Sequence, residues 1–347
     1  MGLRVTFPEA RTVSVIDDPE SALSAGEVRV RTLYSGISAG TELTAYRGTS
    51  PHVTKHWDSE TRLFADGASE PAFPVTNLGY EEVGEVVEVA DAESPVAVGD
   101  RVWGTWGHRT SAVLRGVDAA DRRLPADADP RVGIFSHIGA VALNAVIDAD
   151  IHIGEWVAVF GLGVPGQLVA QLARLNGGRV IVVDGIAARR DLALRLGAEI
   201  ALDPADAVAE TIRELTRGRG ADVAIEISGN ARALHEAIRS VAYNSRVVAA
   251  GFLQGDAVGL RLGEEFHHNR VQLVCSQISG SGPSVSHRWD RYRLNSTIID
   301  LAASGRVDVL SLISSTVELD GVADAYRMLD DNPRDALQVV IAMGGAR

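Results

Sequence analysis

The sequence predicts an α/β protein in which a doubly wound parallel sheet is combined with a second, partly β domain. Two observations on the 347 residues carry this prediction. Up to about residue 125, short runs alternate apolar and polar residues, as half-buried antiparallel strands do. From about residue 131 to 275, short continuous apolar runs alternate with helical patterns, which is typical of parallel strands covered by helices on both faces.

The individual elements follow in chain order. In the first region we expect strands at residues 3–7, 27–33, 82–89 and 100–103. In the second region we expect strands at 157–160, 179–183, 222–225, 246–249 and 271–274, and helices at 166–176 and 188–196. The tail predicts helices near 294–303 and 321–329 and a last strand at 337–341. Residues 49 to 74 show no periodicity, so we expect either a substrate loop or a solvated insertion.

The composition limits the class of protein. Lysine and arginine number 33 against 46 aspartates and glutamates, and the net charge of −13 argues against a nucleic-acid or anionic-membrane partner. The most apolar stretch, residues 156 to 175, is interrupted by three glycines, Pro165 and Gln167 and is not expected to span a membrane. The single cysteine, Cys275, excludes an internal disulfide and multi-cysteine zinc sites, which favours a cytoplasmic protein. Its apolar strand context predicts an inert core thiol.

A glycine-rich segment marks the candidate cofactor site. Residues 161–166 read Gly161-Leu162-Gly163-Val164-Pro165-Gly166, a G-x-G-x-x-G between an expected strand and an expected helix. The first glycine allows a tight turn, the second lets a pyrophosphate approach the backbone, and the third permits close helix packing. The N-terminus of the helix attracts the phosphates. This context predicts a Rossmann dinucleotide-binding domain; the alternative is that the glycines only turn the chain.

The residues that follow favour NAD(H). Asp184 ends the next strand, 18 residues beyond Gly166, where a carboxylate binds the adenosine ribose and repels a 2′-phosphate. Arg189 and Arg190 leave NADP(H) as a less favoured alternative, because an arginine here can accept the 2′-phosphate. Ser228 and Gly251 follow later strands of the same sheet, so we expect them near the nicotinamide.

The order of these parts resembles the medium-chain dehydrogenase/reductase family, the superfamily of the zinc alcohol dehydrogenases. Three segments carry the resemblance: Ser35-Gly36-Ile37-Ser38 is similar to Ser-Gly-Ile-Cys, Gly79-Tyr80-Glu81 to Gly-His-Glu, and Val98-Gly99-Asp100-Arg101-Val102 to Val-Gly-Asp-Arg-Val. The resemblance implies a GroES-like catalytic domain at residues 1–130, a Rossmann domain at 131–278, and a return to the catalytic domain at 279–347. It also implies a homodimer that pairs the edge strand near residues 271–278.

Two departures from the family pattern indicate a zinc-free member. Ser38 and Tyr80 occupy the positions at which the zinc-dependent members place a cysteine and a histidine on the catalytic metal. A serine hydroxyl and a phenol are poor zinc ligands. The four-cysteine structural zinc lobe of the family cannot form in a chain with one cysteine. We therefore expect no metal, and the chain is similar to proteins grouped with bacteriochlorophyllide dehydrogenase.

Without a metal, a side chain must take up or donate the hydroxyl proton during hydride transfer. The resemblance places Tyr80, Thr41 and Ser38 around the former metal position, with Glu81 and Glu42 as residues that can orient the phenol. His137 precedes a helix near the active site and has an ordinary pKa close to neutrality. Each residue has a structural alternative: Tyr80 fills the volume of the metal, His137 caps a helix, and Glu81 accepts a buried hydrogen bond.

These observations give one leading hypothesis and two alternatives. The leading one is a cytoplasmic, zinc-independent, NAD(H)-dependent oxidoreductase that interconverts a secondary alcohol, such as a polyol, sugar or cyclic alcohol, and its ketone. The second is a zinc-free, NADPH-dependent enone or quinone reductase. The third is a dinucleotide-binding protein without turnover. Under the first, the partners are a small-molecule substrate and a second copy of the chain, with no nucleic acid and no membrane.

Overall fold

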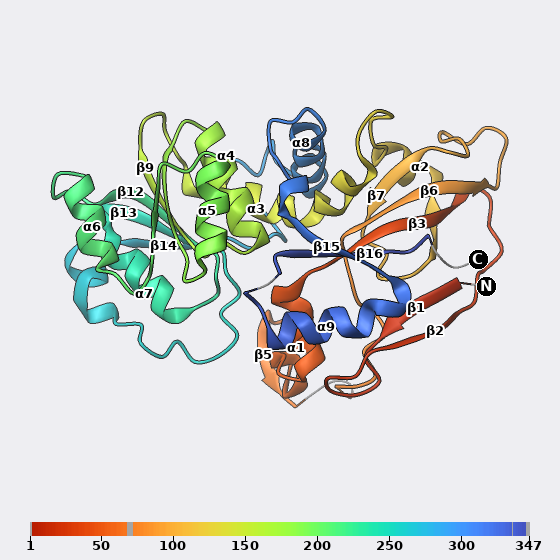
Figure 1. Cartoon of the computed structure of the whole chain (residues 1–347), viewed down its shortest axis with the longest axis horizontal. Coiled ribbons are helices and arrows are strands. Elements are labelled where there is room, and N and C mark those ends of the chain that lie inside the picture. The colour runs from red at the N-terminus through yellow and green to blue at the C-terminus, as the bar shows by residue number, and fades with distance from the viewer. Residues whose placement is uncertain (1, 68–71, 335, 345–347) are drawn as a thin grey trace. The chain divides into compact units, whose positions relative to one another are not determined.

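A computed structural model describes residues 2–67, 72–334 and 336–344 (Figure 1). The chain divides into two compact units, one formed by Met1–His137 with Val309–Arg347 and the other by Ile138–Asp308. The chain therefore returns to the first unit at Val309, later than the expected residue 279. Packing explains the difference, because helix α8 (Arg291–Ala303) packs within the second unit. Its Ile298 lies against Gly139, where an added Cβ would be 2.4 Å from Ile298 Cγ2.

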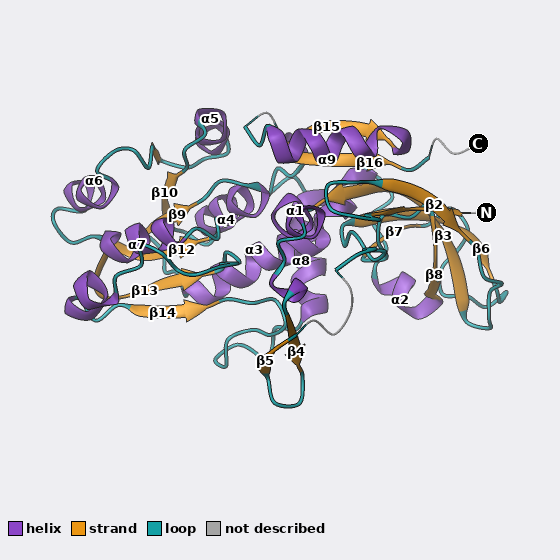
Figure 2. Cartoon of the chain, turned by 90° about the horizontal axis from the view of Figure 1, so that it is seen from below, coloured by secondary structure: helices purple, strands orange, loops and turns teal. Residues whose placement is uncertain are grey.

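The second unit is built on a six-stranded parallel sheet in the order β11-β10-β9-β12-β13-β14. Figure 2 shows the strands from β10 to β14 side by side in this order. The strands are β9 (Trp156–Phe160), β10 (Arg179–Val183), β11 (Ile200–Leu202), β12 (Ala221–Glu226), β13 (Val241–Ala249) and β14 (Gln272–Cys275). From β9 the chain adds β10 and β11 on one side, then returns to add the other three strands on the opposite side. This reversal is the doubly wound arrangement, in which ligands bind beyond the carboxyl ends of the strands at the switch point, here β9 and β12.

Helices alternate with these strands, as the sequence predicts. They are α3 (Ser136–Ala149), α4 (Val164–Leu175), α5 (Ala187–Arg195), α6 (Val208–Leu215) and α7 (Ala231–Ser240), with a π-helical turn at Leu262–Phe266. Helix α4 packs on β9 and β10, and α7 packs on β12 and β13. The core between strands and helices contains fully buried side chains such as Phe160, Ile181 and Ile225. The expected parallel sheet covered by helices is confirmed.

The first unit contains a mixed sheet in the order β15-β16-β3-β6-β7, with β8 also paired to β3. Its strands are β3 (Glu27–Ile37), β6 (Glu82–Val89), β7 (Arg101–Gly104), β8 (Ser111–Arg115), β15 (Ile313–Glu318) and β16 (Gln338–Ala342). Two-stranded pairs are formed by β1 (Gly2–Thr6) with β2 (Ser14–Asp18) and by β4 (Lys55–Asp58) with β5 (Leu63–Asp66). The C-terminal strand β16 pairs antiparallel with β3, so both ends of the chain contribute to the sheet of the first unit.

Three helices complete the first unit: α1 (Ala39–Arg47), α2 (Gly116–Asp121) and α9 (Val322–Asp331). Single turns of 3₁₀ helix lie at Pro51–Val53, Leu310–Leu312 and Leu319–Gly321, with a longer one at Pro130–Phe135. Helices α1 and α9 pack side by side (Figure 1). Beneath them the ring of Phe7 meets Tyr326 edge-on at 4.9 Å and Tyr46 at 5.4 Å between centroids. This aromatic core holds α1, which carries part of the candidate site.

One expectation about local structure is wrong, and another is refined. Residues 49 to 74, of which 68–71 lie outside the described residues, contain a hairpin of β4 and β5 that projects from the rest of its unit in Figure 2, and whether this segment contacts a substrate stays a prediction. Four-residue strands are too short to show a clear period in the sequence. Cys275 is exposed rather than buried in a core, because it lies on β14, the last strand of its sheet. A period of two identifies a strand but not whether that strand has a neighbour.

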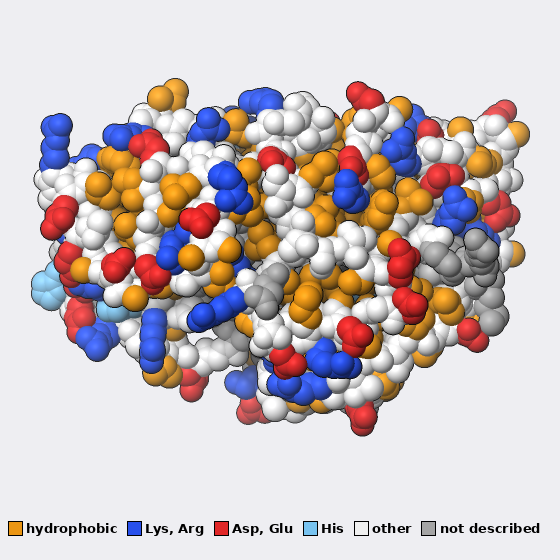
Figure 3. Space-filling view, viewed as in Figure 1, with side chains coloured by type: hydrophobic (Ala, Val, Ile, Leu, Met, Phe, Trp, Pro, Cys, Tyr) orange, Lys and Arg blue, Asp and Glu red, His pale blue; other side chains and the backbone are white. Residues whose placement is uncertain are grey.

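The surface and the most apolar helical segment are typical of a globular chain. The segment Pro130–Ala149 is long and apolar enough to cross a membrane, but 83% of its most apolar window is buried inside the protein, as in a core helix. Acidic and basic side chains are interspersed over the face that Figure 3 shows.

Candidate functional site

Three hydroxyl groups meet in the first unit where β3 ends. Ser38 is the N-cap of α1, and its hydroxyl is free to point elsewhere because it makes no side-chain cap bond. Its Oγ forms a short hydrogen bond with the Tyr80 hydroxyl. The Tyr80 hydroxyl in turn lies 3.2 Å from Thr41 Oγ1 in the first turn of α1. The predicted residues Ser38, Thr41 and Tyr80 therefore form one connected cluster.

Two further predicted residues lie beside this hydroxyl cluster. The ring of His137, at the start of α3, meets the Tyr80 ring edge-on at 4.8 Å between centroids. Glu81 is buried next to Tyr80, and its Oε2 has no hydrogen-bond partner among the described residues. Burial and the charge of Glu42 raise the pKa of Glu81 well above its ordinary value. Five sequence-predicted residues are thus brought together within one unit.

The ionisation of Tyr80 is disfavoured in this environment. Burial raises its pKa, and the nearby charge of Glu81 raises it further, although the hydrogen bonds to Ser38 and Thr41 act in the opposite direction. At neutral pH the side chain is therefore a neutral phenol. A neutral phenol can donate a hydrogen bond to a substrate oxygen, and it needs a positive charge nearby before it can release its proton.

A buried charged network that the sequence did not reveal lies behind the hydroxyl cluster. Glu42 Oε1 accepts a 2.8 Å bond from the Ser38 backbone N–H, and Oε2 contacts His108 Nε2 at 2.8 Å and accepts a short bond from the Tyr326 hydroxyl. His108 Nδ1 lies 2.6 Å from Ser35 Oγ, which donates to Glu82 Oε1 at 3.0 Å.

The hydrogen bonds define the charge of His108. Because the single hydroxyl proton of Ser35 goes to Glu82, Ser35 accepts a proton from Nδ1, and Nε2 needs its own proton to face the Glu42 carboxylate. The ring is then an imidazolium. Burial alone would lower the pKa of His108, but Glu42 and Glu82 raise it. Burial would raise the pKa of Glu42, but the charge of His108 lowers it.

Sequence reasoning missed His108, Glu82 and Tyr326 because their partners are distant in the chain. His108 and Glu42 are 66 residues apart, and Tyr326 and Glu42 are 284 apart. One signal was available: the pair Glu81-Glu82 opens a buried strand, and two buried carboxylates require hydrogen-bond donors or a cation.

In the second unit, the glycine turn between β9 and α4 has the geometry of a phosphate cradle. Gly161 has a φ of +96°, which favours glycine. At Gly166 an added Cβ would lie 1.9 Å from the Gly161 carbonyl oxygen, so helix and turn are in direct contact. At Gly163 an added Cβ would meet only Pro165 Cδ, at 3.8 Å, so this face of the turn is open. Val164 and Pro165 form the first turn of α4.

The acidic residue of the motif holds this turn in place. Asp184 Oδ2 accepts a 2.7 Å bond from the Leu162 N–H, and Oδ1 accepts a 2.8 Å bond from the Ile186 N–H. Each carboxylate oxygen can accept a second bond, so acceptor sites remain for ribose hydroxyls. Burial lowers the pKa of Arg189, while Asp184 opposes that shift. Arg190 is committed elsewhere: its Nη1 donates to the Asp184 carbonyl at 2.6 Å and pairs with Asp203 at 2.8 Å.

The remaining predicted cofactor residues lie on the same edge of the sheet. An added Cβ on Gly161 would be 2.6 Å from Ser228 Cβ, so the loop after β12 touches the glycine turn. Gly251 follows β13, and its N–H donates to the Glu226 carbonyl at 2.9 Å. The glycine turn, Asp184, Ser228 and Gly251 thus surround the carboxyl ends of neighbouring strands, where a dinucleotide binds in this type of sheet.

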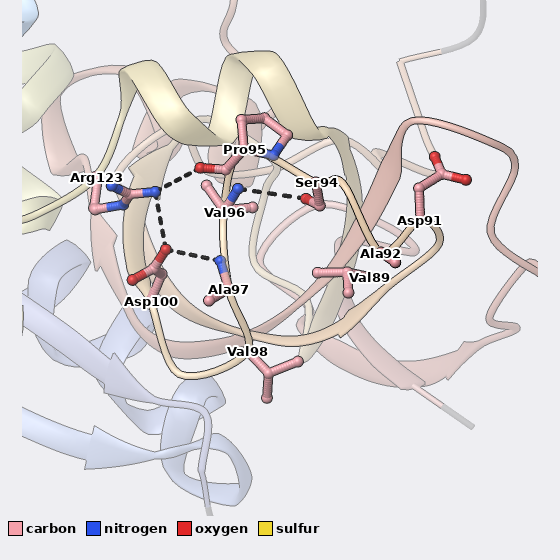
Figure 4. A pocket seen from close by; sticks show the side chains of 10 residues that line it. All are labelled: Val89, Asp91, Ala92, Ser94, Pro95, Val96, Ala97, Val98, Asp100 and Arg123. Atoms are coloured by element: carbon pink, nitrogen blue, oxygen red, sulfur yellow. Dashed lines mark hydrogen bonds and ion pairs between the residues drawn. The ribbon is translucent and has the colours of Figure 1, made fainter.

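Two surface hollows among the described residues lie outside both sites. A hollow of 520 Å³ in the first unit is bounded by residues 89–100 and Arg123 (Figure 4). Arg123 pairs with Asp100 at 3.0 Å and donates to the Pro95 carbonyl at 2.8 Å, so its charge is already compensated. A second hollow lies against Tyr34 and Glu318. Neither contains a predicted site residue.

Comparisons with known proteins agree with this geometry. Residues 165–293 match the zinc-binding dehydrogenase family. The chain is 30% identical over 337 residues to D-guloside 3-dehydrogenase of Shigella flexneri, covering 95% of this chain and 96% of that one. It belongs to the zinc-binding dehydrogenase family. The expected resemblance to medium-chain dehydrogenases is confirmed at this level.

Solved structures of other dehydrogenases share the fold. 2R,3R-butanediol dehydrogenase from Bacillus subtilis has a TM-score of 0.78 at 22% identity, with 99% of each chain covered. Galactitol-1-phosphate dehydrogenase from Escherichia coli has a TM-score of 0.77 at 18% identity, covering 98% of this chain and 99% of that one. The predicted combination of a Rossmann sheet and a partly β domain is confirmed.

The family is named for zinc, but the residues of this dehydrogenase do not fit a catalytic zinc ion. Ser38 and Tyr80 use their oxygens in a hydrogen bond to each other, and the raised pKa of Tyr80 disfavours a phenolate ligand. The imidazole of His137 and the carboxylates of Glu81 and Glu42 neighbour that pair, but Glu42 already binds the Ser38 N–H, His108 and Tyr326. Zinc prefers three or four thiolate, imidazole or carboxylate ligands. No step of the reaction is therefore assigned to a metal.

A second group of metal-type ligands lies in the other unit. His235, Glu264 and Glu265 bring one ligand atom each to within 4.8 Å of one another. Both carboxylates already have cationic neighbours: Glu264 lies 3.4 Å from Arg261, and Glu265 lies 3.4 Å from Arg239. This group has to be controlled for when metal content is measured.

Proposed function

We propose that the protein is a zinc-independent, NAD(H)-dependent dehydrogenase that interconverts a secondary alcohol and its ketone. The observation that carries the proposal is the connected hydroxyl cluster of Ser38, Tyr80 and Thr41. It supplies hydrogen-bond donors and acceptors at the position that the resemblance assigns to the metal of zinc-dependent members. A glycoside or polyol is the proposed substrate class, because the relative from Shigella flexneri that is 30% identical to this chain is named a D-guloside 3-dehydrogenase.

The preference for NAD(H) is supported by the end of β10. The Asp184 carboxylate is fixed by two backbone N–H groups, and a fixed negative charge repels a 2′-phosphate. Arg190 would have to give up its bonds to Asp203 and the Asp184 carbonyl to bind that phosphate. The glycine turn offers the open Gly163 face and the N-terminus of α4 to the pyrophosphate.

The side chains of the cluster donate or accept the hydroxyl proton of the substrate. The nicotinamide, when bound, takes hydride from the carbinol carbon or returns it, and its oxidised ring supplies a positive charge. In ketone reduction, the neutral Tyr80 phenol donates its proton to the developing alkoxide. In alcohol oxidation, Tyr80 receives the substrate proton as it gives its own to Ser38 or Thr41, and that hydroxyl releases its original proton in turn. The imidazole of His137, whose ring meets the Tyr80 ring, is the base that takes up the released proton. Glu81, buried beside Tyr80, orients the phenol.

The remaining parts of the proposal concern the setting of the enzyme. We place it in the cytoplasm as a homodimer acting on a small molecule, with no nucleic-acid or membrane partner. The net charge of −13 argues against a nucleic-acid or membrane partner, and the single cysteine favours the cytoplasm. The homodimer is supported by the edge strand β14.

The test is turnover by protein purified without chelator. We expect NAD⁺-dependent oxidation of glycosides or polyols, and Tyr80→Phe should lower kcat by about 100-fold with little change in NADH affinity. Tyr243→Phe, an exposed tyrosine of the second unit, is the control and should leave kcat unchanged. Zinc content should stay well below one ion per chain, and any bound zinc should be lost in His235→Ala without loss of activity.

Three results would overturn the proposal. One is full activity of Tyr80→Phe. Another is stoichiometric zinc that persists in His235→Ala and is required for turnover. The third is NADPH-dependent reduction of enones without oxidation of any secondary alcohol.

A further inference from the structure

A buried glutamate that the proposed reaction does not use lies at the dinucleotide edge of the second unit. Glu226 is the last residue of β12 and is fully buried. Its Oε1 accepts a 2.7 Å bond from the Ser228 N–H and a short bond from the Ser228 hydroxyl. Its main-chain carbonyl accepts bonds from the N–H groups of Ala250 and Gly251, at 2.8 and 2.9 Å. The side chain of Glu226 therefore holds the loop after β12, and its main-chain carbonyl holds the loop after β13.

The contacts around Glu226 leave no spare space. An added Cβ on Gly251 would lie 2.2 Å from the Gly229 nitrogen and 2.8 Å from Glu226 Oε2. An added Cβ on Gly161 would lie 2.6 Å from Ser228 Cβ. The loops after β9, β12 and β13 are thus packed directly on one another, so a shift of Ser228 displaces both neighbours.

The strand order separates these loops from the adenosine end of the site. Asp184 directly follows β10, on one side of β9, whereas β12 and β13 lie on the other side. A dinucleotide that crosses the switch point therefore places its adenosine over β10 and its nicotinamide over the loops that Glu226 ties together. We propose that Glu226 is a positioning residue whose side chain fixes the Ser228 loop, on which the Gly251 loop packs, for the nicotinamide half of the dinucleotide.

The role requires an acceptor rather than a negative charge. Burial raises the pKa of Glu226, and its described contacts are hydrogen bonds from neutral groups. The oxygen of a glutamine side chain can accept the same two bonds. A glutamine should therefore preserve the function, while an alanine should lose it.

The inference rests on dinucleotide binding by the proposed function, and the experiment separates the two. We would measure the affinity of each variant for AMP and for the dinucleotide that the wild type binds, NAD(H) or NADP(H). All measurements are made well below the melting temperature of each variant. Glu226→Ala should weaken dinucleotide binding by about tenfold or more, yet change AMP binding by less than about twofold. Glu226→Gln should stay within about threefold of wild type for both ligands. Glu236→Ala, on α7 of the same unit, is the matched control and should change neither affinity.

The outcomes are distinguishable. If the wild type binds no dinucleotide, the proposed function fails. If it binds one and Glu226→Ala binds it equally well, the positioning role fails. Equal losses of AMP affinity and dinucleotide affinity in Glu226→Ala would show a general structural role. Equal losses of dinucleotide affinity in Glu226→Gln and Glu226→Ala would show that the hydrogen-bond acceptor is not what matters. Either result overturns the inference.

Discussion

At the scale of single residues, the site depends on a compensated charge. Glu42 caps the start of α1 through the Ser38 N–H and is neutralised by His108, which is fully buried. Removing one partner of a buried ion pair leaves an uncompensated charge, which costs far more than an exposed pair contributes. The position of Ser38, and with it the hydroxyl cluster, therefore depends on a histidine outside the substrate-binding residues.

This pair makes stability depend on pH in a defined direction. The contribution of His108, whose pKa is raised above 6.5, is complete below pH 6.5 and is lost as pH rises through the raised value. The contribution of Glu42, whose pKa is lowered from 4.5, is complete above pH 4.5 and is lost as pH falls through the lowered value. The raised pKa values of Glu81 and Glu82 add to the decline at higher pH.

We therefore expect His108→Gln to lower the free energy of unfolding by about 3 kcal/mol near pH 6, with a shallower decline toward pH 9 than in the wild type. Urea denaturation followed across that pH range measures both effects. His152→Gln, an exposed histidine paired with Glu155, is the control and should follow the wild-type curve. A steep wild-type decline that persists unchanged in His108→Gln would contradict the assigned charge.

At the scale of elements, two glycines of the β9–α4 turn have different roles, one in packing and one in cofactor binding. Gly166 is in contact with the Gly161 carbonyl, so a methyl group there must push the helix from the turn. Gly163 has space for a methyl group and a φ of −62°, which alanine readily adopts. The two glycines of one motif should therefore respond differently to the same substitution.

Gly163→Ala should leave the melting temperature within about 3 °C of wild type while weakening NADH binding by about tenfold, since the methyl group occupies the pyrophosphate approach. Gly166→Ala should lower the free energy of unfolding by about 2 kcal/mol or more. Calorimetry and NADH fluorescence measure these quantities. Wild-type NADH affinity in Gly163→Ala would contradict the assigned cradle.

At the scale of the whole molecule, an unpaired edge strand is available for association. Among the described strands, β14 pairs only with β13, and Leu273 on it is 39% exposed beside the exposed Cys275. A flat apolar edge is normally covered by another chain or element. The proposed homodimer covers it with a second copy in a two-fold arrangement.

Leu273→Asp should therefore convert a dimer into a monomer in sedimentation experiments and increase the rate at which a thiol reagent modifies Cys275. Ile153→Asp, at another exposed apolar position of the same unit, should remain dimeric. A wild-type monomer, or a dimer unaffected by Leu273→Asp, would contradict the edge-strand interface.

The fold and half of the site could be predicted because their signals are local. The glycine turn, the strand that ends at Asp184 and the hydroxyl residues at the family's metal positions depend on spacings of a few residues. The β4–β5 hairpin could not be predicted, since two four-residue strands carry too little periodicity.

The sequence by itself determined a dinucleotide-binding sheet, a partly β domain and a metal position without good metal ligands. Only the tertiary structure decided that His108 compensates Glu42, that Cys275 lies on an exposed edge, and that Glu226 ties two loops together. Local spacing follows from the period of a helix or strand, and the sequence displays it directly. Compensation of buried charge depends instead on contacts between residues far apart in the chain, which only folding brings together.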